Sequence, residues 1–251
     1  MQGAPWLFGA LALVGAAHAQ ERPQWTLTAN DDATIAHTTL QSRAAVIARC
    51  AGGQLSVLLQ GVPAPTDNMS VTTIVDASVD LTNGWWLAGT EGMLMSRRPA
   101  TYIRGLAEGR SISLSVLRPG ASPWIIDSPL PEDRAPIDAV LTACDTPLTD
   151  PRDALEQVSK TSRPERAPAS WSRQPTPNWP ASTPQNIRQG SVVLTCITGQ
   201  EGRLADCRAE SESPSGAGFG REAVKAANAA RLSPDTPAGD VVQFEIRFHL
   251  P

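Results

Sequence analysis

Short runs of alternating apolar and polar residues recur through the first half of the chain, separated by glycine, proline and asparagine. A period of two is typical of β-strands that bury one face, and the intervening residues indicate turns. Many short strands in succession predict an antiparallel, sandwich-like β domain. The predicted strands are residues 25–28, 45–50, 55–59, 71–75, 84–87, 111–117 and 124–126.

The hydrophobic period then changes from that of a strand to that of a helix. Ile137, Val140, Leu141 and Cys144 stand at positions i, i+3, i+4 and i+7, which share one face of an α-helix. We therefore expect a helix over residues 135–144 that closes the β-rich domain with Cys144 on its buried side.

Regular patterns disappear over residues 150–186, where proline is frequent. This composition is typical of an extended linker, partly in the polyproline II conformation. The prolines are Pro151, Pro164, Pro168, Pro175, Pro177, Pro180 and Pro184.

After the predicted linker the pattern indicates two strands, one alanine-rich helix and a last strand. The order ββαβ within about sixty residues requires the helix to cover one face of a small sheet. The chain is thus predicted to be α+β, with residues 1–19 as a signal peptide, 20–149 as the β-rich domain, 150–186 as the linker and 187–251 as the second domain. The predicted elements of that domain are strands 191–198, 203–210 and 241–248 and helix 219–231.

The first nineteen residues have the form of a secretory signal peptide. An apolar run over residues 6–14 is followed by Ala17-His18-Ala19, a small-residue cleavage motif, although no lysine or arginine precedes the run. The run is shorter than the roughly 20 residues of a membrane span. We expect export to the periplasm with cleavage; the alternative is an uncleaved inner-membrane anchor facing the periplasm.

Composition narrows the functional classes. The net charge of −4 and the isoelectric point near 5.4 exclude the basic field that nucleic-acid binding requires. Four cysteines in an exported chain indicate disulfides, and three pairings are possible. There is no Cys-x-x-Cys motif, and His37 and His249 are the only histidines beyond the signal, so we expect no metal site and no cofactor.

The last quarter of the chain resembles the C-terminal domain of the TonB family in the order and spacing of several short motifs. Leu232 stands where that family has an aromatic residue, and the lead-in before Gly190 is shorter. The matching segments are Gly190-Ser191-Val192-Val193-Leu194, Glu201-Gly202-Arg203-Leu204, the helix around Ala223, Arg231-Leu232-Ser233-Pro234 and the strand over residues 241–250.

A subgroup of exported TonB-like proteins is more similar still. It carries one cysteine in each strand of the hairpin, like Cys196 and Cys207, and a Trp and Pro before the domain, like Trp171 and Pro175. It also has an acidic-Pro-small-Gly-x-Gly-Phe-Gly stretch, like residues 212–220. The resemblance implies a ββαβ fold whose final strand is an edge to which partner segments pair.

The hairpin predicts one disulfide. If Glu201-Gly202 forms a two-residue turn, Cys196 lies opposite Cys207, and opposed residues are close enough to be bridged. Leu204 and Cys207 would share a buried face only if a bulge lies between them. Cys50 and Cys144 then remain for each other, tying an early strand to the closing helix, and both bridges are interpreted as structural.

Several other groups are candidates for function, but structural roles are favoured for them. Trp85 and Trp86 could form a binding platform, but neighbours in a strand point to opposite faces. The aspartates lack the order of a calcium loop, the serines lack a nucleophile elbow, and Gly216-x-Gly218-x-Gly220 lacks the lysine of a phosphate loop. These aspartates and serines are Asp31, Asp32, Asp76, Asp80, Ser111 and Ser113.

The sequence therefore predicts a periplasmic, non-enzymatic protein without catalytic residues, whose TonB-like domain binds a protein or peptide segment by strand addition. The partner would be an outer-membrane or periplasmic protein. One alternative is an anchored TonB-type energy transducer, which alone would involve the membrane. Another is a ligand-binding or hydrolytic first domain around Trp85, Trp86 and Trp124. The predicted partner-binding edge consists of Val241, Val242, Gln243, Phe244, Glu245, Ile246, Arg247 and Phe248.

Overall fold

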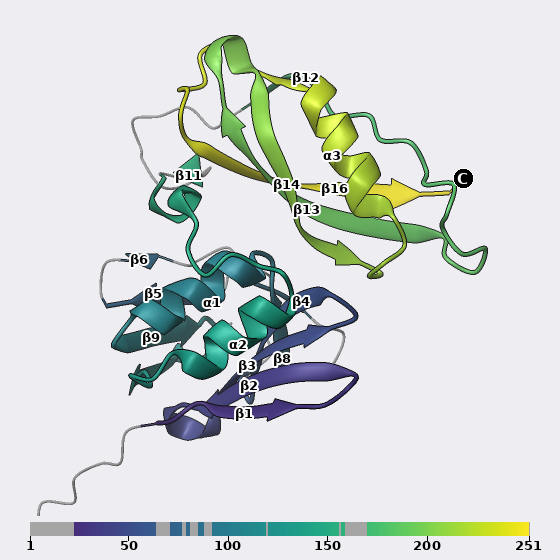
Figure 1. Ribbon diagram of the computed structural model, residues 1–251. Coiled ribbons are helices and arrows are strands. Elements are labelled where there is room, and N and C mark those ends of the chain that lie inside the picture. The colour runs from purple at the N-terminus through teal and green to yellow at the C-terminus, as the bar shows by residue number, and fades with distance from the viewer. Residues whose placement is uncertain are drawn as a thin grey trace, which may run out of the picture.

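A computed structural model describes residues 23–63, 71–76, 79–80, 85–87, 92–118, 120–155, 157–158 and 170–250. Within these residues the chain is mixed α and β, rich in strands, and its sheets are almost entirely antiparallel (Figure 1). The mixed, strand-rich class was expected from the sequence.

The N-terminal domain contains two antiparallel sheets around one core. One has the order β1-β2-β3-β4-β8-β7 and the other the order β10-β9-β5-β6. Two helices, α1 (Pro99–Glu108) and α2 (Ala135–Ala143), pack against the first sheet, side by side in Figure 1. The strands are β1 (Thr26–Ala29), β2 (Ala33–Thr39), β3 (Ala45–Ala51), β4 (Gln54–Gln60), β5 (Val71–Val75), β6 (Val79–Asp80), β7 (Trp85–Leu87), β8 (Met93–Ser96), β9 (Ser111–Val116) and β10 (Trp124–Pro129).

Helix α1 was not predicted, although its sequence contains the pattern that forms it. Proline at its first position has the backbone angle that a helix needs. Pro99, Tyr102, Ile103 and Leu106 stand at i, i+3, i+4 and i+7, and all four are buried. Arg104 lies on another side of the helix and is only 4% exposed. Its buried guanidinium takes part in the contacts with the second domain that are described below.

The C-terminal domain has one helix over one face of a sheet of order β11-β16-β13-β14. Alternate residues of β13 point toward that helix, and alanines on the helix let it approach closely. The elements are β11 (Gln157–Val158), β12 (Trp171–Arg173), β13 (Gln189–Thr198), β14 (Leu204–Ser213), α3 (Phe219–Ala229), β15 (Arg231–Leu232) and β16 (Val241–His249); short 3-10 helices cover Gln41–Arg43, Pro151–Ala154 and Gln200–Gly202.

The end of the predicted linker is packed against this domain. Trp171 pairs with Leu232 in the small β12–β15 sheet, and the Ser233 N–H donates to the Ser170 carbonyl at 2.7 Å. The Trp171 ring meets Phe244 edge-on, with ring centroids 5.0 Å apart. Residues 170–173 therefore differ from the extended linker that proline content suggested, because tryptophan and backbone pairing anchor them.

Candidate partner-binding edge of the C-terminal sheet

Strand β16 pairs with β13 in one unbroken register, from His249 opposite Gln189 to Val241 opposite Ile197. The flanking Leu250 N–H donates to the Arg188 carbonyl at 3.0 Å, so even-numbered residues of β16 direct their backbone groups toward β13. By the same alternation, Glu245, Arg247 and His249 direct their N–H and C=O groups to the outer side of the sheet.

The outer side of β16 is occupied only at its beginning. The short strand β11 runs parallel to it and pairs with Val241 and Val242. No other strand of the described residues pairs with this side of β16. The beginning of the predicted edge is therefore covered by the chain itself, and the edge continues past Phe248 to His249.

The two faces of β16 differ in chemistry. Phe244, Ile246 and Phe248 point toward α3, where Phe248 contacts the buried Phe219 with centroids 4.7 Å apart. Glu245 and Arg247 lie on the opposite face, and their side chains are hydrogen-bonded at 3.2 Å. A strand added at this edge would meet an apolar face and a charged face.

The other edge of the sheet, β14, is irregular. Its pairing with β13 shifts twice, between Val193 and Leu194 and between Thr195 and Ile197. Bulges of this kind interrupt the row of outward backbone groups and are a common protection of edge strands against unwanted pairing. Strand β16 is thus the more regular template for strand addition.

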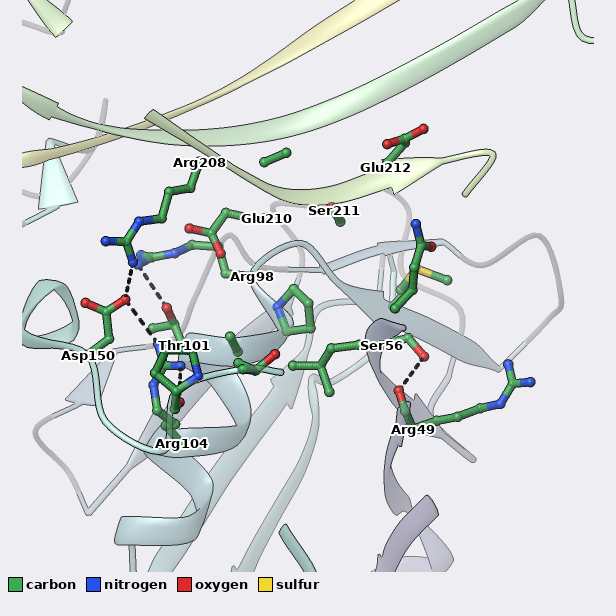
Figure 2. A pocket seen from close by; sticks show the side chains of 18 of the residues that line it. Arg49, Ser56, Arg98, Thr101, Arg104, Asp150, Arg208, Glu210, Ser211 and Glu212 are labelled. Atoms are coloured by element: carbon green, nitrogen blue, oxygen red, sulfur yellow. Dashed lines mark hydrogen bonds and ion pairs between the residues drawn. The ribbon is translucent and has the colours of Figure 1, made fainter. Parts of the chain in front are cut away.

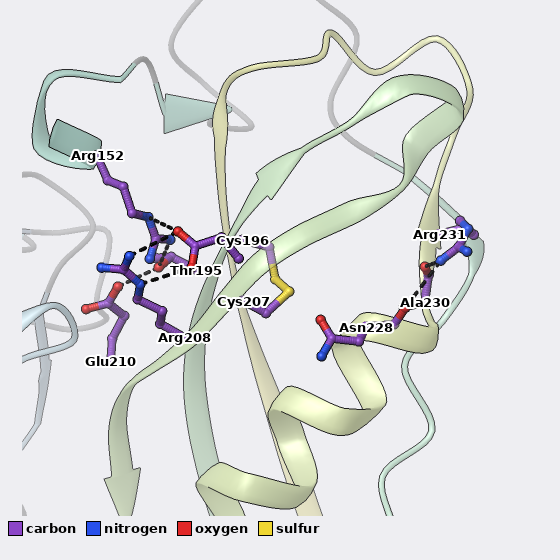
Figure 3. The surroundings of a disulfide bond; sticks show 10 residues. Arg152, Thr195, Cys196, Cys207, Arg208, Glu210, Asn228, Ala230 and Arg231 are labelled. Atoms are coloured by element: carbon purple, nitrogen blue, oxygen red, sulfur yellow. Dashed lines mark hydrogen bonds and ion pairs between the residues drawn. A yellow bond between two sulfur atoms is a disulfide. The ribbon is translucent and has the colours of Figure 1, made fainter.

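The second bulge belongs to the hairpin disulfide (Figure 3). Cys196 and Cys207 are bonded, with Sγ atoms 2.08 Å apart, and the unpaired step on β14 includes Asp206, whose φ is 45°. Leu204 is buried and Cys207 packs on the same core. The predicted bond between Cys196 and Cys207 is confirmed, and so is the predicted bulge between Leu204 and Cys207.

A tight turn is present at Glu201-Gly202, but the loop is one residue longer than predicted, because Gly199 rather than Gln200 lies opposite Arg203. Arg203 N–H donates to the Gln200 carbonyl at 3.2 Å, and Glu201 and Gly202 both have positive φ. Gly202 has no room for a side chain, since a Cβ there would lie 2.2 Å from the Leu232 carbonyl oxygen. In the first domain Cys50 and Cys144 are bonded at 2.04 Å, as predicted.

A charged network joins the two domains through the start of the predicted linker. Asp150 lies 2.8 Å from Arg208 of β14 and 3.8 Å from Arg104 of α1. Arg104 also makes a two-nitrogen contact with Asp153, at 2.6 and 3.0 Å. Arg152, which is 7% exposed, donates to the fully buried Thr195 hydroxyl of β13 at 2.6 Å (Figure 3).

Ionisation of Asp150 depends on this network. Burial alone would raise the pKa of its carboxyl, but the Arg152 backbone N–H and the charges of Arg208, Arg104 and Arg152 outweigh burial and lower it. The carboxylate is held in its charged form, so it stabilises the domain interface and is a poor proton donor at neutral pH.

The network borders a cleft of about 510 Å³ between the domains (Figure 2). Arg98, Thr101, Arg104 and Asp150 gather on one side of it, and Arg208 and Glu210 come from β14. These charges are largely matched within the protein, as in Arg104–Asp153 and Arg208–Asp150. The cleft therefore resembles a polar domain interface more than a pocket prepared for a charged ligand.

The remaining sequence candidates are dispersed. His37 and His249 are exposed on β2 and β16, and Trp124 is half-buried against the first core. Asp76 accepts hydrogen bonds from Arg110 and Ser111; the backbone bond from Arg110 contributes most to lowering the pKa of this carboxyl. The side chains of Asp80, Trp85 and Trp86 lie outside the described residues.

The part of the chain that the structure describes holds neither a cluster of metal ligands nor a membrane-spanning helix. No group of three or more His, Cys, Asp or Glu side chains could hold a metal ion there. No helix in that part of the chain is long and apolar enough to cross a membrane.

The interface residues Arg97, Arg104, Asp150 and Arg152 were not predicted from the sequence. The helical pattern of α1 could have indicated one of them, because it places Arg104 outside the apolar stripe of a helix that packs on the core.

Both disulfides are consistent with an oxidising, exported environment. Comparison with known proteins found no matching family model and no matching curated protein.

Proposed function

We propose that this is a periplasmic, non-enzymatic protein whose C-terminal domain binds an extended protein segment by strand addition along the outer side of β16. The observation that carries the proposal is the contrast between the two edges of the sheet. β16 keeps one register over its length and directs Glu245, Arg247 and His249 outward, whereas β14 is bulged twice. Backbone hydrogen bonds would supply affinity, and the alternating side chains of the partner would supply selectivity.

The proposed partner is a segment of another periplasmic or outer-membrane protein. The TonB-like sequence motifs support this choice, since strand pairing at the final strand is what that resemblance implies. Asp150 contacts both Arg104 of the first domain and Arg208 of the second. Because the two domains are joined in this way, the proposal concerns the whole chain and not the C-terminal domain alone.

The test uses random nonapeptides displayed on phage and selected on the full-length, oxidised protein. A selected peptide is then synthesised, and amide hydrogen exchange is measured with and without it. We expect exchange at Glu245, Arg247 and His249 to slow on binding, because outward N–H groups become hydrogen-bonded. Phe244 and Ile246 already donate toward β13 and should change little.

A pair of proline variants tests the same geometry. Glu245→Pro deletes an outward donor and should weaken peptide binding at least about tenfold while circular dichroism stays native. Ile246→Pro deletes a donor to β13 and should unfold the domain. If selected peptides protect none of the three outward amides, or if correctly folded Glu245→Pro binds them as well as wild type, strand addition at β16 is wrong.

A further inference from the structure

The segment that leaves the first domain crosses the sheet of the second domain strand by strand. Asp150 contacts Arg208 of β14 at 2.8 Å. Two residues later, Arg152 donates to the Thr195 hydroxyl of β13 at 2.6 Å (Figure 3). Strand β11 then pairs with the outer side of β16. Successive points of one short segment are therefore attached to β14, to β13 and to the proposed binding edge.

Strand β11 occupies particular backbone groups of that edge. Val158 lies opposite Val242, whose own N–H and C=O groups face β13. In a parallel pair a residue bonds to the two neighbours of the residue opposite it, so Val158 takes one outward group each from Val241 and Gln243. The outward groups from Glu245 onward lie beyond β11. The protein itself therefore occupies the beginning of the edge that a partner strand would use.

Strand β11 is weak but is held close to its site. It has two residues, and its pairing is parallel, which is the less stable arrangement. Arg152, which is 7% exposed, anchors the segment on the buried Thr195 five residues before Gln157. A short tether gives a segment an effective concentration on the order of millimolar at its site. Strand β11 thus stays in place without a partner, yet a longer strand with more backbone hydrogen bonds can replace it.

We propose that β11 is an autoinhibitory strand: it competes with the partner for Val241 and Gln243, and a segment that pairs with the whole of β16 must displace it. The inference rests on the proposed strand addition at β16. It adds that the beginning of the linker regulates this edge. Release of β11 should raise the affinity for a partner long enough to reach Val241, because the partner then gains the backbone hydrogen bonds that β11 now makes.

Amide hydrogen exchange of the unbound protein tests whether β11 occupies the edge. Val158→Pro deletes the N–H that bonds to β16 and should release β11. The Gln243 amide should then exchange at least about tenfold faster than in wild type, because it loses its acceptor, whereas Phe244, which donates toward β13, should change little. Thr176→Pro is the matched control, at an exposed position between two prolines of the same linker, and should change neither amide. Circular dichroism establishes that each variant is folded.

Peptide binding tests the competition itself. Nonapeptides, which match the length of β16, are selected on phage against the full-length, oxidised Val158→Pro protein. A synthesised peptide should bind this variant about tenfold more tightly than wild type, and Thr176→Pro should bind it as wild type does. Gln157→Gly/Val158→Gly weakens the strand through backbone entropy without deleting a donor, so the gain should be smaller, about threefold. Adding Glu245→Pro to either variant should remove most of the binding.

The outcomes separate this inference from the proposed function. Autoinhibition by β11 is wrong, and strand addition stands, if the selected peptide binds wild type and Val158→Pro equally while Glu245→Pro still weakens binding. Equal exchange of the Gln243 amide in the two proteins also overturns autoinhibition, as does a gain in affinity that Thr176→Pro reproduces. Failure to select any peptide whose binding Glu245→Pro weakens overturns strand addition, and this inference with it.

Discussion

Asp150 and Arg208 form an ion pair, 2.8 Å apart, that joins the segment leaving the first domain to strand β14 of the second. The same carboxylate approaches Arg104 of α1 at 3.8 Å and accepts from the Arg152 backbone N–H at 3.0 Å. Its side chain is 13% exposed, so these charges are only partly screened by water. One aspartate thus links both domains and begins the short helix between them.

Replacing Asp150 tests how strongly this link stabilises the protein. Asp150→Asn keeps an N-cap side chain and removes the charge, so the free energy of unfolding at pH 7 should fall by about 1 kcal/mol; Asp150→Ala also removes the cap and should cost about 2 to 3 kcal/mol. Urea unfolding measures both values. Asp235→Asn, an exposed aspartate of the loop before β16, is the control and should have little effect.

The effect of Asp150→Asn should depend on pH in one direction. The pKa of Asp150 is lower in the folded protein than its ordinary value of 3.8, so its charge contributes fully above that value. As the pH falls below 3.8 and through the folded pKa, the carboxylate is protonated and the contribution is lost. The stability difference from wild type should therefore be constant between pH 5 and 8 and shrink progressively as the pH falls below 3.8. An equal difference at pH 2 and pH 7 would contradict this role.

Limited trypsin digestion should cut the connection between the domains within a narrow interval. The sequence predicts cleavage within residues 150–186, and the structure protects both ends of this segment: Arg152 is buried against Thr195, and Arg173 lies in β12. Cleavage is expected after Lys160 or Arg166, because Arg163 precedes a proline. Mass spectrometry identifies the sites, and early cutting after Arg152 or Arg173 would contradict the assignment.

The digested halves should then stay together. Arg104, Asp150 and Arg208 do not depend on an intact chain between Lys160 and Arg166 for their contacts. Size-exclusion chromatography of the digest should give one peak of nearly full-length size, and Asp150→Ala should favour separation. Independent domains on a flexible linker would separate in both cases.

Local patterns accounted for much of the fold. The helix predicted over 135–144 is α2. The hairpin count paired Cys196 with Cys207 correctly although Gly199, not Gln200, lies opposite Arg203, because the bulge at Asp206 offsets the extra loop residue. Strand β2, in contrast, was missed. Its core positions Ala36 and Thr38 are buried but small or polar, so they give no apolar alternation to recognise.

The domain interface could not be predicted from the sequence, because its contacts are polar and distant along the chain. Arg104 and Asp153 are 49 residues apart, and Arg97 and Glu245 are farther apart still. Isolated charges usually indicate a solvated surface, and only the fold reveals which are buried together. For the binding edge, the sequence indicated the strand, and the register of β13 identified which backbone groups point outward.

Removing the hairpin disulfide should destabilise the second domain. The loop between Cys196 and Cys207 spans 11 residues, for which chain entropy predicts a loss of about 2 to 3 kcal/mol in the double variant Cys196→Ala/Cys207→Ala. Urea unfolding with and without reductant provides the measurement. Because reduction of wild type breaks both bridges, the comparison is made in the Cys50→Ala/Cys144→Ala background, where reduction should cost as much as adding Cys196→Ala/Cys207→Ala. A quadruple variant as stable as the oxidised Cys50→Ala/Cys144→Ala protein would show that the hairpin bridge adds nothing.

The stretch over residues 212–220 acts as a cap for helix α3. The Glu212 carboxylate accepts the backbone N–H groups of Gly218, Phe219 and Gly220 at 2.9, 3.1 and 3.0 Å, which satisfies the donors that a helix N-terminus leaves unpaired. A Cβ at Gly220 would lie 2.9 Å from the same carboxylate, so the glycine gives the acid room.

Substitutions at Glu212 and Gly220 should therefore act on one interaction. Glu212→Ala should lower the free energy of unfolding by about 2 kcal/mol, and Glu212→Gln by about 1 kcal/mol because an amide oxygen accepts more weakly. Gly220→Ala should displace the carboxylate and cost a similar amount. In a double-mutant cycle measured by urea unfolding, Glu212→Ala/Gly220→Ala should cost clearly less than the sum of the single changes, since the cap can be lost only once. Glu201→Gln, at an exposed turn position, serves as the control; additive losses would mean that glycine and carboxylate act separately.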